Sequence, residues 1–217
     1  MIIRWGELSR NRPTVLINPI KVFRTAEHPF KPVERVVSKF VGRPIQRLLL
    51  PERRRPFVLA GNWDRRTKAI DDSEKYQLVH DLVRHRDDFR ASRLYRQMLH
   101  RIETEQVAHY KKTRIASVDE LDRFVGGYLI GLIDSLAQDG YRADLADSKG
   151  GFAMVGRDGE LIKGLSGQHR FYAIRALGGA LVPLRVHCVH PHWLQRIQAN
   201  DAHGIVAELK RIEAAHQ

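Results

Sequence analysis

The chain has 217 residues, 43% of them hydrophobic, which is enough for one core and predicts a single domain with an elaboration. Its 37 Lys and Arg against 25 Asp and Glu give a net charge of +12, which favours polyanionic partners without choosing among them. With no run of about 18 apolar residues, no membrane span is expected, and the N-terminus lacks the apolar stretch of a signal peptide. The single Cys188 fits a reducing cytoplasm and excludes an intramolecular disulfide.

Residues 1–56 form an N-terminal extension in which the sequence patterns for helices and strands are weak. Residues 14–17 predict a short strand, because apolar and β-branched residues run up to an Asn-Pro turn signal. Residues 32–40 fit a helix and a strand equally well, so both remain open. The basic run at 53–55 is most simply a solvated surface.

The apolar residues 57–60 predict a strand that ends in Gly61-Asn62-Trp63-Asp64. A carboxylate at a strand end is well placed to act as a general base or to hold Mg²⁺, which makes Asp64 a candidate catalytic residue. The competing interpretation is an Asp that caps a turn beside a core Trp, and the sequence leaves both open. Trp63 and Arg65 are candidates for the rim of a substrate pocket.

A helical elaboration is predicted over 57–116, with helices at 73–88 and 93–105 joined to the next element by a polar, basic connection at 110–114. A longer helix follows, because a Ser117–Glu120 capping box precedes apolar residues spaced three and four apart, and Gly140 ends the pattern. The glycines inside that helix predict close packing against another element; they are Gly126, Gly127 and Gly131.

The C-terminal half is organised around the turn Gly164-Leu165-Ser166-Gly167-Gln168-His169-Arg170. An alternating segment at 152–162, broken at Arg157-Asp158-Gly159, predicts a β-hairpin before it. A helix at 171–177, ended by Gly178-Gly179, and a strand at 181–189 are predicted after it.

A turn that joins a strand to a helix N-terminus is suited to holding an anion, because free backbone N–H groups and the positive end of the helix dipole meet there. Gly167 allows a ligand to approach the backbone closely. Arg170 supplies a forked positive charge that suits phosphate oxygens, and His169 can donate or accept a hydrogen bond at neutral pH.

His190 and His192 follow the last predicted strand, and with His187 inside that strand they have a spacing that a metal site could use. We predict no metal site, because Pro191 interrupts any helical face and no Cys or carboxylate completes the set; His190 or His192 is instead expected to line the pocket mouth. The tail, 193–217, predicts one or two helices whose Ile205 and Leu209 pack back onto the core.

This order of hairpin, Gly-x-His-Arg turn, helix, Gly-Gly and Val-Pro-x-x-Val strand resembles the core of the ParB/sulfiredoxin-like superfamily, here over 117–192. The resemblance implies an α+β fold: a small mixed sheet with packed helices, extended at the N-terminus by a partly helical elaboration. It also implies that the turn grips the phosphates of a nucleotide.

The branches of that superfamily lead to different expectations. Sulfiredoxins carry a catalytic Cys where this chain has Gln168, so their chemistry is not expected. ParB proteins continue into a helix-turn-helix domain, which the residues after His190 are too few to form. The chain is closest in style to the free-serine kinases, although their Gly-His-His-Arg-type turn differs from this one at Gln168.

The resemblance therefore predicts a cytoplasmic, nucleotide-dependent phosphotransferase that uses ATP or ADP, with CTP as an alternative, and Mg²⁺. The residues implied for the phosphates are Ser166, Gly167, Gln168, His169 and Arg170. Asp64 would be the base, with His169 and Arg170 at the phosphoryl group. The acceptor would be a small-molecule or glycan hydroxyl, and Arg65 and Arg185 would hold it if it is acidic.

Two further functions remain open from the sequence. The first is a nucleotide-responsive module, without phosphotransfer, that binds nucleic acid through the basic surface. The second is a ParB-like nuclease, for which no two-metal carboxylate cluster is visible in the sequence.

Overall fold

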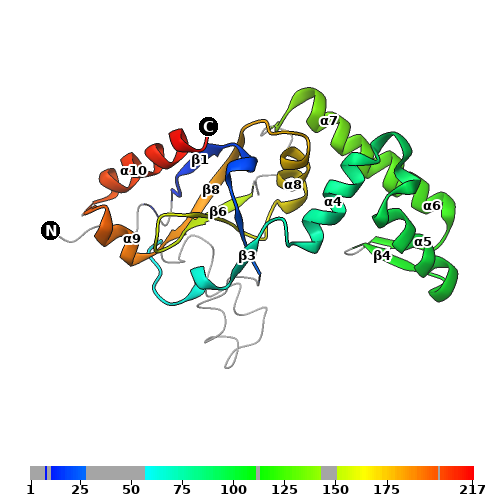
Figure 1. The fold of residues 1–217 in the computed structure, drawn as a ribbon, viewed down its shortest axis with the longest axis horizontal. Helices are drawn as coiled ribbons and strands as arrows, with labels where there is room; N and C mark the ends of the chain where they lie inside the picture. Colours follow the sequence, from blue (N-terminus) through cyan, green and yellow to red (C-terminus); the bar gives the residue numbers. More distant parts are fainter. Residues whose placement is uncertain (1–7, 9–10, 28–56, 111–112, 143–150, 200) are drawn as a thin grey trace.

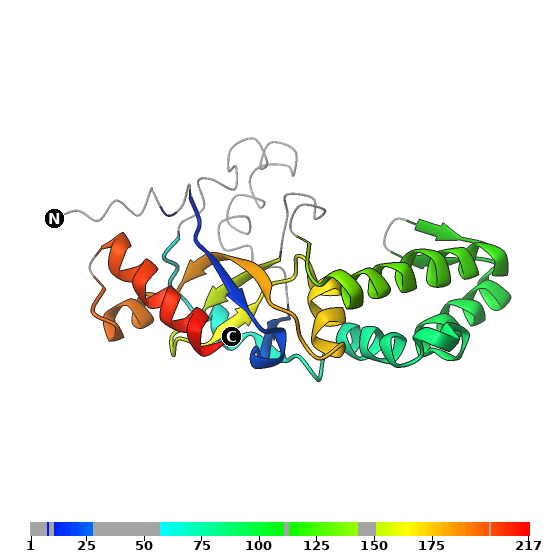
Figure 2. The same ribbon diagram turned by 90° about the horizontal axis from the view of Figure 1, so that it is seen from above.

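The computed structural model describes residues 8, 11–27, 57–110, 113–142, 151–199 and 201–217. The fold is mixed α+β, as predicted. A six-stranded sheet forms a body, and a set of helices extends from it as an arm, with one short helix, α8, between the two (Figures 1 and 2).

The sheet of the body is mixed and runs in the order β1-β8-β6-β7-β2-β3. The pairs β8·β6 and β7·β2 are parallel, whereas β1·β8, β6·β7 and β2·β3 are antiparallel. The strands are β1 (Thr14–Ile17), β2 (Arg24–Ala26), β3 (Thr67–Ala69), β6 (Phe152–Val155), β7 (Leu161–Lys163) and β8 (Val182–Val189).

The body also carries α8 (Gln168–Ala176), α9 (Pro191–Arg196), α10 (Ala202–Ala215) and the 3₁₀ turns η1 (Pro19–Lys21) and η3 (Trp63–Arg65). The arm consists of α4 (Glu74–Arg84), η4 (Arg86–Ala91), α5 (Arg93–Glu105), the hairpin β4 (Ala108–Tyr110) and β5 (Thr113–Ile115), α6 (Val118–Asp122), η5 (Arg123–Ile130) and α7 (Gly131–Asp139). Of these, η5 is a π-helix that continues α6 into α7.

Both faces of the sheet are covered. The main core lies on one face, where α8 contributes Phe171 and Tyr172, and it continues into the arm. Tyr76 of α4 packs edge-on against Tyr172, with ring centroids 5.5 Å apart, so α8 links arm and body. A smaller cluster around Met154 covers the other face. Burial of this apolar surface is the main stabilising term of the fold.

Much of the predicted element order is confirmed. The hairpin, the strand-to-helix turn and the following strand are present as β6, β7, α8 and β8, and the predicted helix at 93–105 is α5. Ser117 caps α6 by accepting from the Glu120 N–H, and the Glu120 carboxylate accepts from the Ala116 N–H. Gly140 ends α7 with φ of +69°.

Some local predictions were wrong. Residues 57–60 form only an isolated bridge, Val58 to Val189, instead of a strand. The helix predicted over 73–88 ends at Arg84, because the chain turns into η4. The connection at 110–114 contains parts of β4 and β5, which pair as a hairpin. Pro191, which was expected to interrupt a helix, is instead the first residue of α9, a position where its missing N–H costs nothing.

The predictions for 32–40 and 53–55 lie outside the described residues.

Candidate phosphate-binding turn

The turn between β7 and α8 comprises four residues, 164–167. The local geometry explains why two of them are glycines. Gly167, the N-cap of α8, has φ of +70°, a conformation that favours glycine. A Cβ on Gly164 would lie 2.0 Å from the Phe152 ring. No side chain in the described part of the chain caps α8, and its first backbone hydrogen bond runs from the Phe171 N–H to the Gly167 carbonyl. The N–H groups before Phe171 are therefore available to an anion.

Two of the predicted phosphate-binding side chains stand on the first turn of α8. Arg170 is half-buried and forms no hydrogen bond or ion pair with any residue in the described part of the chain. The His169 ring is also half-buried, and its centroid lies 5.7 Å from that of Tyr110 in the arm. The structure thus brings His169 and Arg170 together at the turn, and no acidic side chain of the described residues pairs with the Arg170 charge.

The side chain of Gln168 points into the protein instead. It is 4% exposed, and its amide nitrogen donates to the Thr25 hydroxyl and the Tyr172 hydroxyl. Its amide oxygen accepts from the Lys75 ammonium at 2.9 Å. Only the backbone of Gln168 remains to contact a phosphate, so its side chain acts by fixing the start of α8 against β2 and α4.

A buried lysine lies beneath the turn. The ammonium of Lys163, the last residue of β7, donates to the Gly164 carbonyl at 2.7 Å and to the Ser166 carbonyl at 2.5 Å. The residue is 0% exposed. Its ammonium also lies 5.4 Å from the Phe171 ring centroid and 5.9 Å from that of Phe152. Lys163 therefore holds two carbonyls of the turn toward the interior.

The Lys163 charge has no acidic partner among the described residues. Burial disfavours the charged form, and the charge of Lys75 adds to the effect, so the pKa of Lys163 falls from 10.5 to about 7. A buried ammonium that lacks a counter-charge is costly for a fold to maintain. An anion bound at the turn would supply the missing negative charge.

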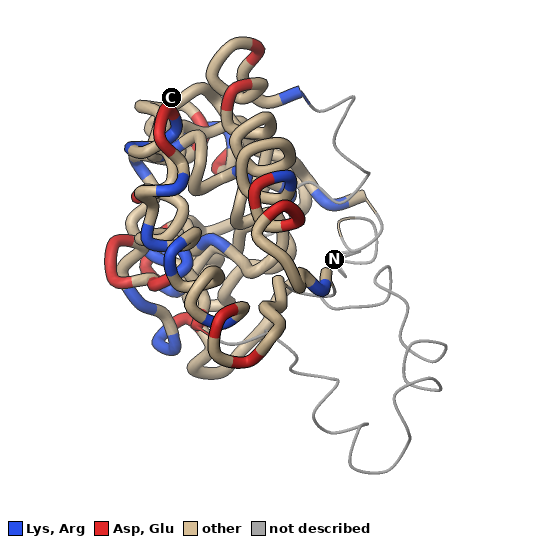
Figure 3. Tube along the Cα trace, turned by 90° about the vertical axis from the view of Figure 1, so that its right-hand side faces the viewer, with Lys and Arg blue, Asp and Glu red and all other residues tan. Residues whose placement is uncertain are grey.

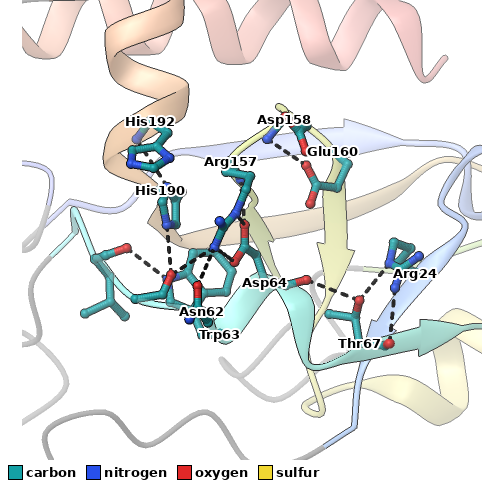
Figure 4. Close-up of polar contacts among 12 residues, drawn as sticks. Arg24, Asn62, Trp63, Asp64, Thr67, Arg157, Asp158, Glu160, His190 and His192 are labelled. Atoms are coloured by element: carbon teal, nitrogen blue, oxygen red, sulfur yellow. Dashed lines mark hydrogen bonds and ion pairs between the residues drawn. The ribbon is translucent and has the colours of Figure 1, made fainter.

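Asp64 belongs to a different polar cluster (Figure 4). Its carboxylate accepts from Arg157 Nε at 2.6 Å, Arg157 Nη2 at 2.8 Å and the Arg157 backbone N–H at 3.0 Å. The guanidinium also donates to the Asn62 side chain and the Gly61 carbonyl. This cluster fastens the segment around Asp64 to the turn between β6 and β7.

The ion pair makes Asp64 a weak base. Burial alone would raise its pKa, but the hydrogen bonds and charge of Arg157 outweigh burial and lower the pKa to about 2. A general base is most effective when its pKa lies near the working pH. In addition, no hydrogen bond or ion pair joins Asp64 to residues 164–170, which leave β7 at the end opposite the Arg157 turn.

The predicted rim residues occupy different environments. Trp63 is half-buried and donates from its indole N–H to the Leu59 carbonyl. His190 is 2% exposed; its Nε2 lies 3.0 Å from the Gly61 carbonyl, and its Nδ1 accepts from the His192 N–H and so caps α9. Arg65 and Arg185 are exposed, on η3 and β8. Trp63, Arg65 and His190 belong to the segment around Asp64. Arg185 instead pairs in register with Phe152, whose carbonyl accepts from the Gly164 N–H at the start of the turn.

Sequence reasoning missed three basic residues. Lys163 could have been recognised as a lysine in an apolar strand whose two faces are both covered. Arg157 was assigned only to a hairpin turn, and its partner Asp64 is 93 residues away. Arg175 of α8 donates to the carbonyls of Pro19, Ile20 and Val22, contacts that no local pattern indicates.

The described residues include no group of three or more His, Cys, Asp or Glu side chains that could hold a metal ion. In the same part of the chain, no helix has both the length and the apolar character that crossing a membrane requires. The Cys188 thiol is buried, which raises its pKa to about 12 and makes it a poor nucleophile.

Charge on the described residues is mixed: Lys and Arg alternate with Asp and Glu along the trace (Figure 3). Over half of the excess positive charge belongs to residues outside that part, chiefly to 28–56. Comparison of the chain with protein-family models, curated proteins and solved structures found no match.

Proposed function

We propose that this protein binds a nucleotide, with the phosphates held at the turn of residues 164–170. The observation that carries the proposal is the Lys163 ammonium, fully buried against the turn without an acidic partner in the described residues. A phosphate group at the turn would provide the counter-charge that this ammonium lacks, at short range and in a medium that screens charge poorly.

The turn offers complementary groups to such a phosphate. The uncapped N–H groups at the start of α8 are donors, and the helix dipole favours negative charge there. Arg170 brings a guanidinium that can donate two parallel hydrogen bonds to phosphate oxygens. His169 stands beside it and can donate a hydrogen bond when its facing nitrogen is protonated.

A nucleotide is preferred over a simple anion because the motifs of the turn and its flanking elements resemble those of the ParB/sulfiredoxin-like superfamily, in which this turn grips a nucleotide. ATP and ADP are the first ligands to test, followed by CTP. The described residues contain no ready set of metal ligands, so Mg²⁺ would arrive coordinated by the phosphates of the nucleotide.

Phosphoryl transfer to a hydroxyl acceptor is the second candidate function. Arg170 favours it, because a guanidinium without a partner in the described residues is free to stabilise charge on a transferring phosphoryl group. Asp64 supports it poorly, because Arg157 occupies its carboxylate. His169 is better placed than Asp64 to take a proton at the turn.

Thermal unfolding in the presence of ATP, ADP, CTP, GTP or tripolyphosphate, with and without Mg²⁺, tests nucleotide binding. A ligand at 100 times its Kd stabilises the folded state by roughly 2.7 kcal/mol, which raises Tm by several degrees. We expect Arg170→Ala to abolish that shift and Arg211→Ala, which removes an exposed arginine of α10, to preserve it. Equal shifts in wild type and Arg170→Ala would disprove the phosphate site.

Transfer is tested separately by following ³¹P signals of bound ATP or ADP in the presence of pooled hydroxyl acceptors, including amino acids, sugars and glycans. A new phosphate ester that His169→Gln fails to form supports transfer. Nucleotide binding without any product supports the binding module instead. For that module, a salt-dependent affinity for duplex DNA would indicate that the basic surface contacts nucleic acid.

A further inference from the structure

A row of four rings leads from the turn onto the arm. The ring centroids are separated by 5.7 Å between His169 and Tyr110, 4.9 Å between Tyr110 and Phe124, and 5.8 Å between Phe124 and Tyr128. The last two rings are close to parallel, at 28°. The row therefore connects the first turn of α8 with the outer surface of the arm.

Elements far apart in the sequence build this row. Tyr110 ends β4, and Phe124 and Tyr128 lie on the π-helix η5. The hairpin and η5 belong to the arm, while His169 belongs to α8, which stands between arm and body (Figures 1 and 2). π-helical segments are rare and occur frequently at functional sites.

The outer end of the row is open. Tyr128 is 61% exposed, while Tyr110 and Phe124 are half-buried and support it from below. Burial raises the pKa of Tyr110 to about 12, and nearby Tyr128 adds to that effect, consistent with two neighbouring phenols. An exposed, supported aromatic surface beside a phosphate site matches the usual arrangement for binding nucleobases, in which each base stacks on a ring.

We propose that the row His169–Tyr110–Phe124–Tyr128 binds the nucleobase of the ligand whose phosphate is held at the turn. The inference rests on the proposed function, because the turn fixes where the base begins. Stacking on aromatic rings depends little on which base is bound. The row should therefore favour ligands that carry a base over ligands that lack one, without distinguishing between bases. A mononucleotide and a short single-stranded nucleic acid both carry a base next to a phosphate, so either could bind in this way.

Binding of three probes to the full chain distinguishes these cases: ATP, tripolyphosphate and a ten-nucleotide oligothymidylate. We expect Tyr128→Leu, which removes the ring and keeps an apolar side chain, to weaken binding of a base-containing probe roughly fivefold or more. Tripolyphosphate affinity should not change. Phe23→Leu is the matched control, because Phe23 is 68% exposed and lies outside the row. If Tyr128→Leu loses affinity for the oligonucleotide alone, the base that stacks on the row belongs to a nucleic acid strand. If it loses affinity for ATP, the base belongs to a mononucleotide.

The failures of the two proposals are distinct. Unchanged affinity of Tyr128→Leu for ATP and oligothymidylate, with binding still lost in Arg170→Ala, would overturn the aromatic row and leave the phosphate site standing. Absence of binding of all three probes to the wild-type protein would overturn the phosphate site, and the row with it. Circular dichroism of each variant verifies that the arm remains folded.

Discussion

The Lys163 ammonium and the Ser166 carbonyl, three residues apart, form a partly buried hydrogen bond inside the turn that precedes α8. This bond draws the carbonyl inward, and a second bond from the same ammonium does so for Gly164. Two carbonyls that would otherwise repel a phosphate are thereby occupied. One buried charge thus both shapes the turn and gives it a positive interior.

Lys163→Met removes this charge and keeps most of the apolar stem. We expect nucleotide and tripolyphosphate affinity to fall by about tenfold or more, because the bound phosphate loses a nearby positive charge and the turn loses the ammonium that holds the Gly164 and Ser166 carbonyls inward. Titration calorimetry measures the effect, with Lys210→Met on the exposed surface of α10 as control. Affinity equal to that of the wild type would show that the ammonium is only structural.

Stability should rise with pH because of Lys163. Its pKa is about 7 in the folded protein against 10.5 for an ordinary lysine, so between these values the unfolded chain binds a proton that the folded chain does not. Under that condition the free energy of unfolding increases with pH. Urea unfolding at intervals from pH 7 to 10 should reveal this increase in the wild type, and Lys163→Met should lack it.

Asp64→Asn is expected to weaken the fold. The substitution leaves Arg157 without its carboxylate partner, and breaking a buried ion pair costs about 3 kcal/mol, or a fall in Tm of roughly 6–12 °C. Asp158→Asn is the control, because the Asp158–Arg196 pair is exposed and such pairs contribute little. A stable Asp64→Asn protein that binds nucleotide but forms no phosphate ester would instead identify Asp64 as the base.

The same ion pair sets a limit at low pH. The pKa of Asp64 is lowered from 3.8 to about 2 by Arg157, against the opposing effect of burial. Its contribution to stability is therefore complete above about pH 4 and is lost as the pH falls toward 2. Acid unfolding monitored by circular dichroism should shift to higher pH in the Asp64→Asn protein.

Local signals predicted the elements that surround the turn. The glycine at 167 and the alternation in 152–162 are properties of adjacent residues, so β6, β7 and the start of α8 could be located without a structure. The capping residues of α6 are equally local. In each case a short-range steric or hydrogen-bonding preference decides the conformation.

Contacts distant in sequence decided what could not be predicted. Asp64 was a candidate base because its neighbours along the chain do not reveal Arg157, which binds it from 93 residues away. Gln168 was assigned to phosphate because its position in the motif does not show that Thr25, Tyr172 and Lys75 occupy its amide. The role of a charged or amide side chain depends on its partners, and the tertiary fold determines which partners it meets.

The glycines of the long helical segment make a last test of packing. The sequence predicts close contacts at Gly126, Gly127 and Gly131. Among the described residues, only a Cβ on Gly126 would meet a neighbour, the Phe89 ring at 2.8 Å, and no described atom lies within 4 Å of a Cβ on Gly131. Gly131→Ala should therefore stabilise the protein by about 0.5–1 kcal/mol through the better helix propensity of alanine.

Gly126→Ala should not give this gain, because the added methyl group must displace Phe89 from the arm. Thermal unfolding of the two variants under the same conditions compares them directly, and each serves as the control for the other. A similar rise in Tm for both would mean that Phe89 does not pack tightly on η5. A fall in Tm for Gly131→Ala would show that its open surface is covered in solution, by a partner or by another part of the chain.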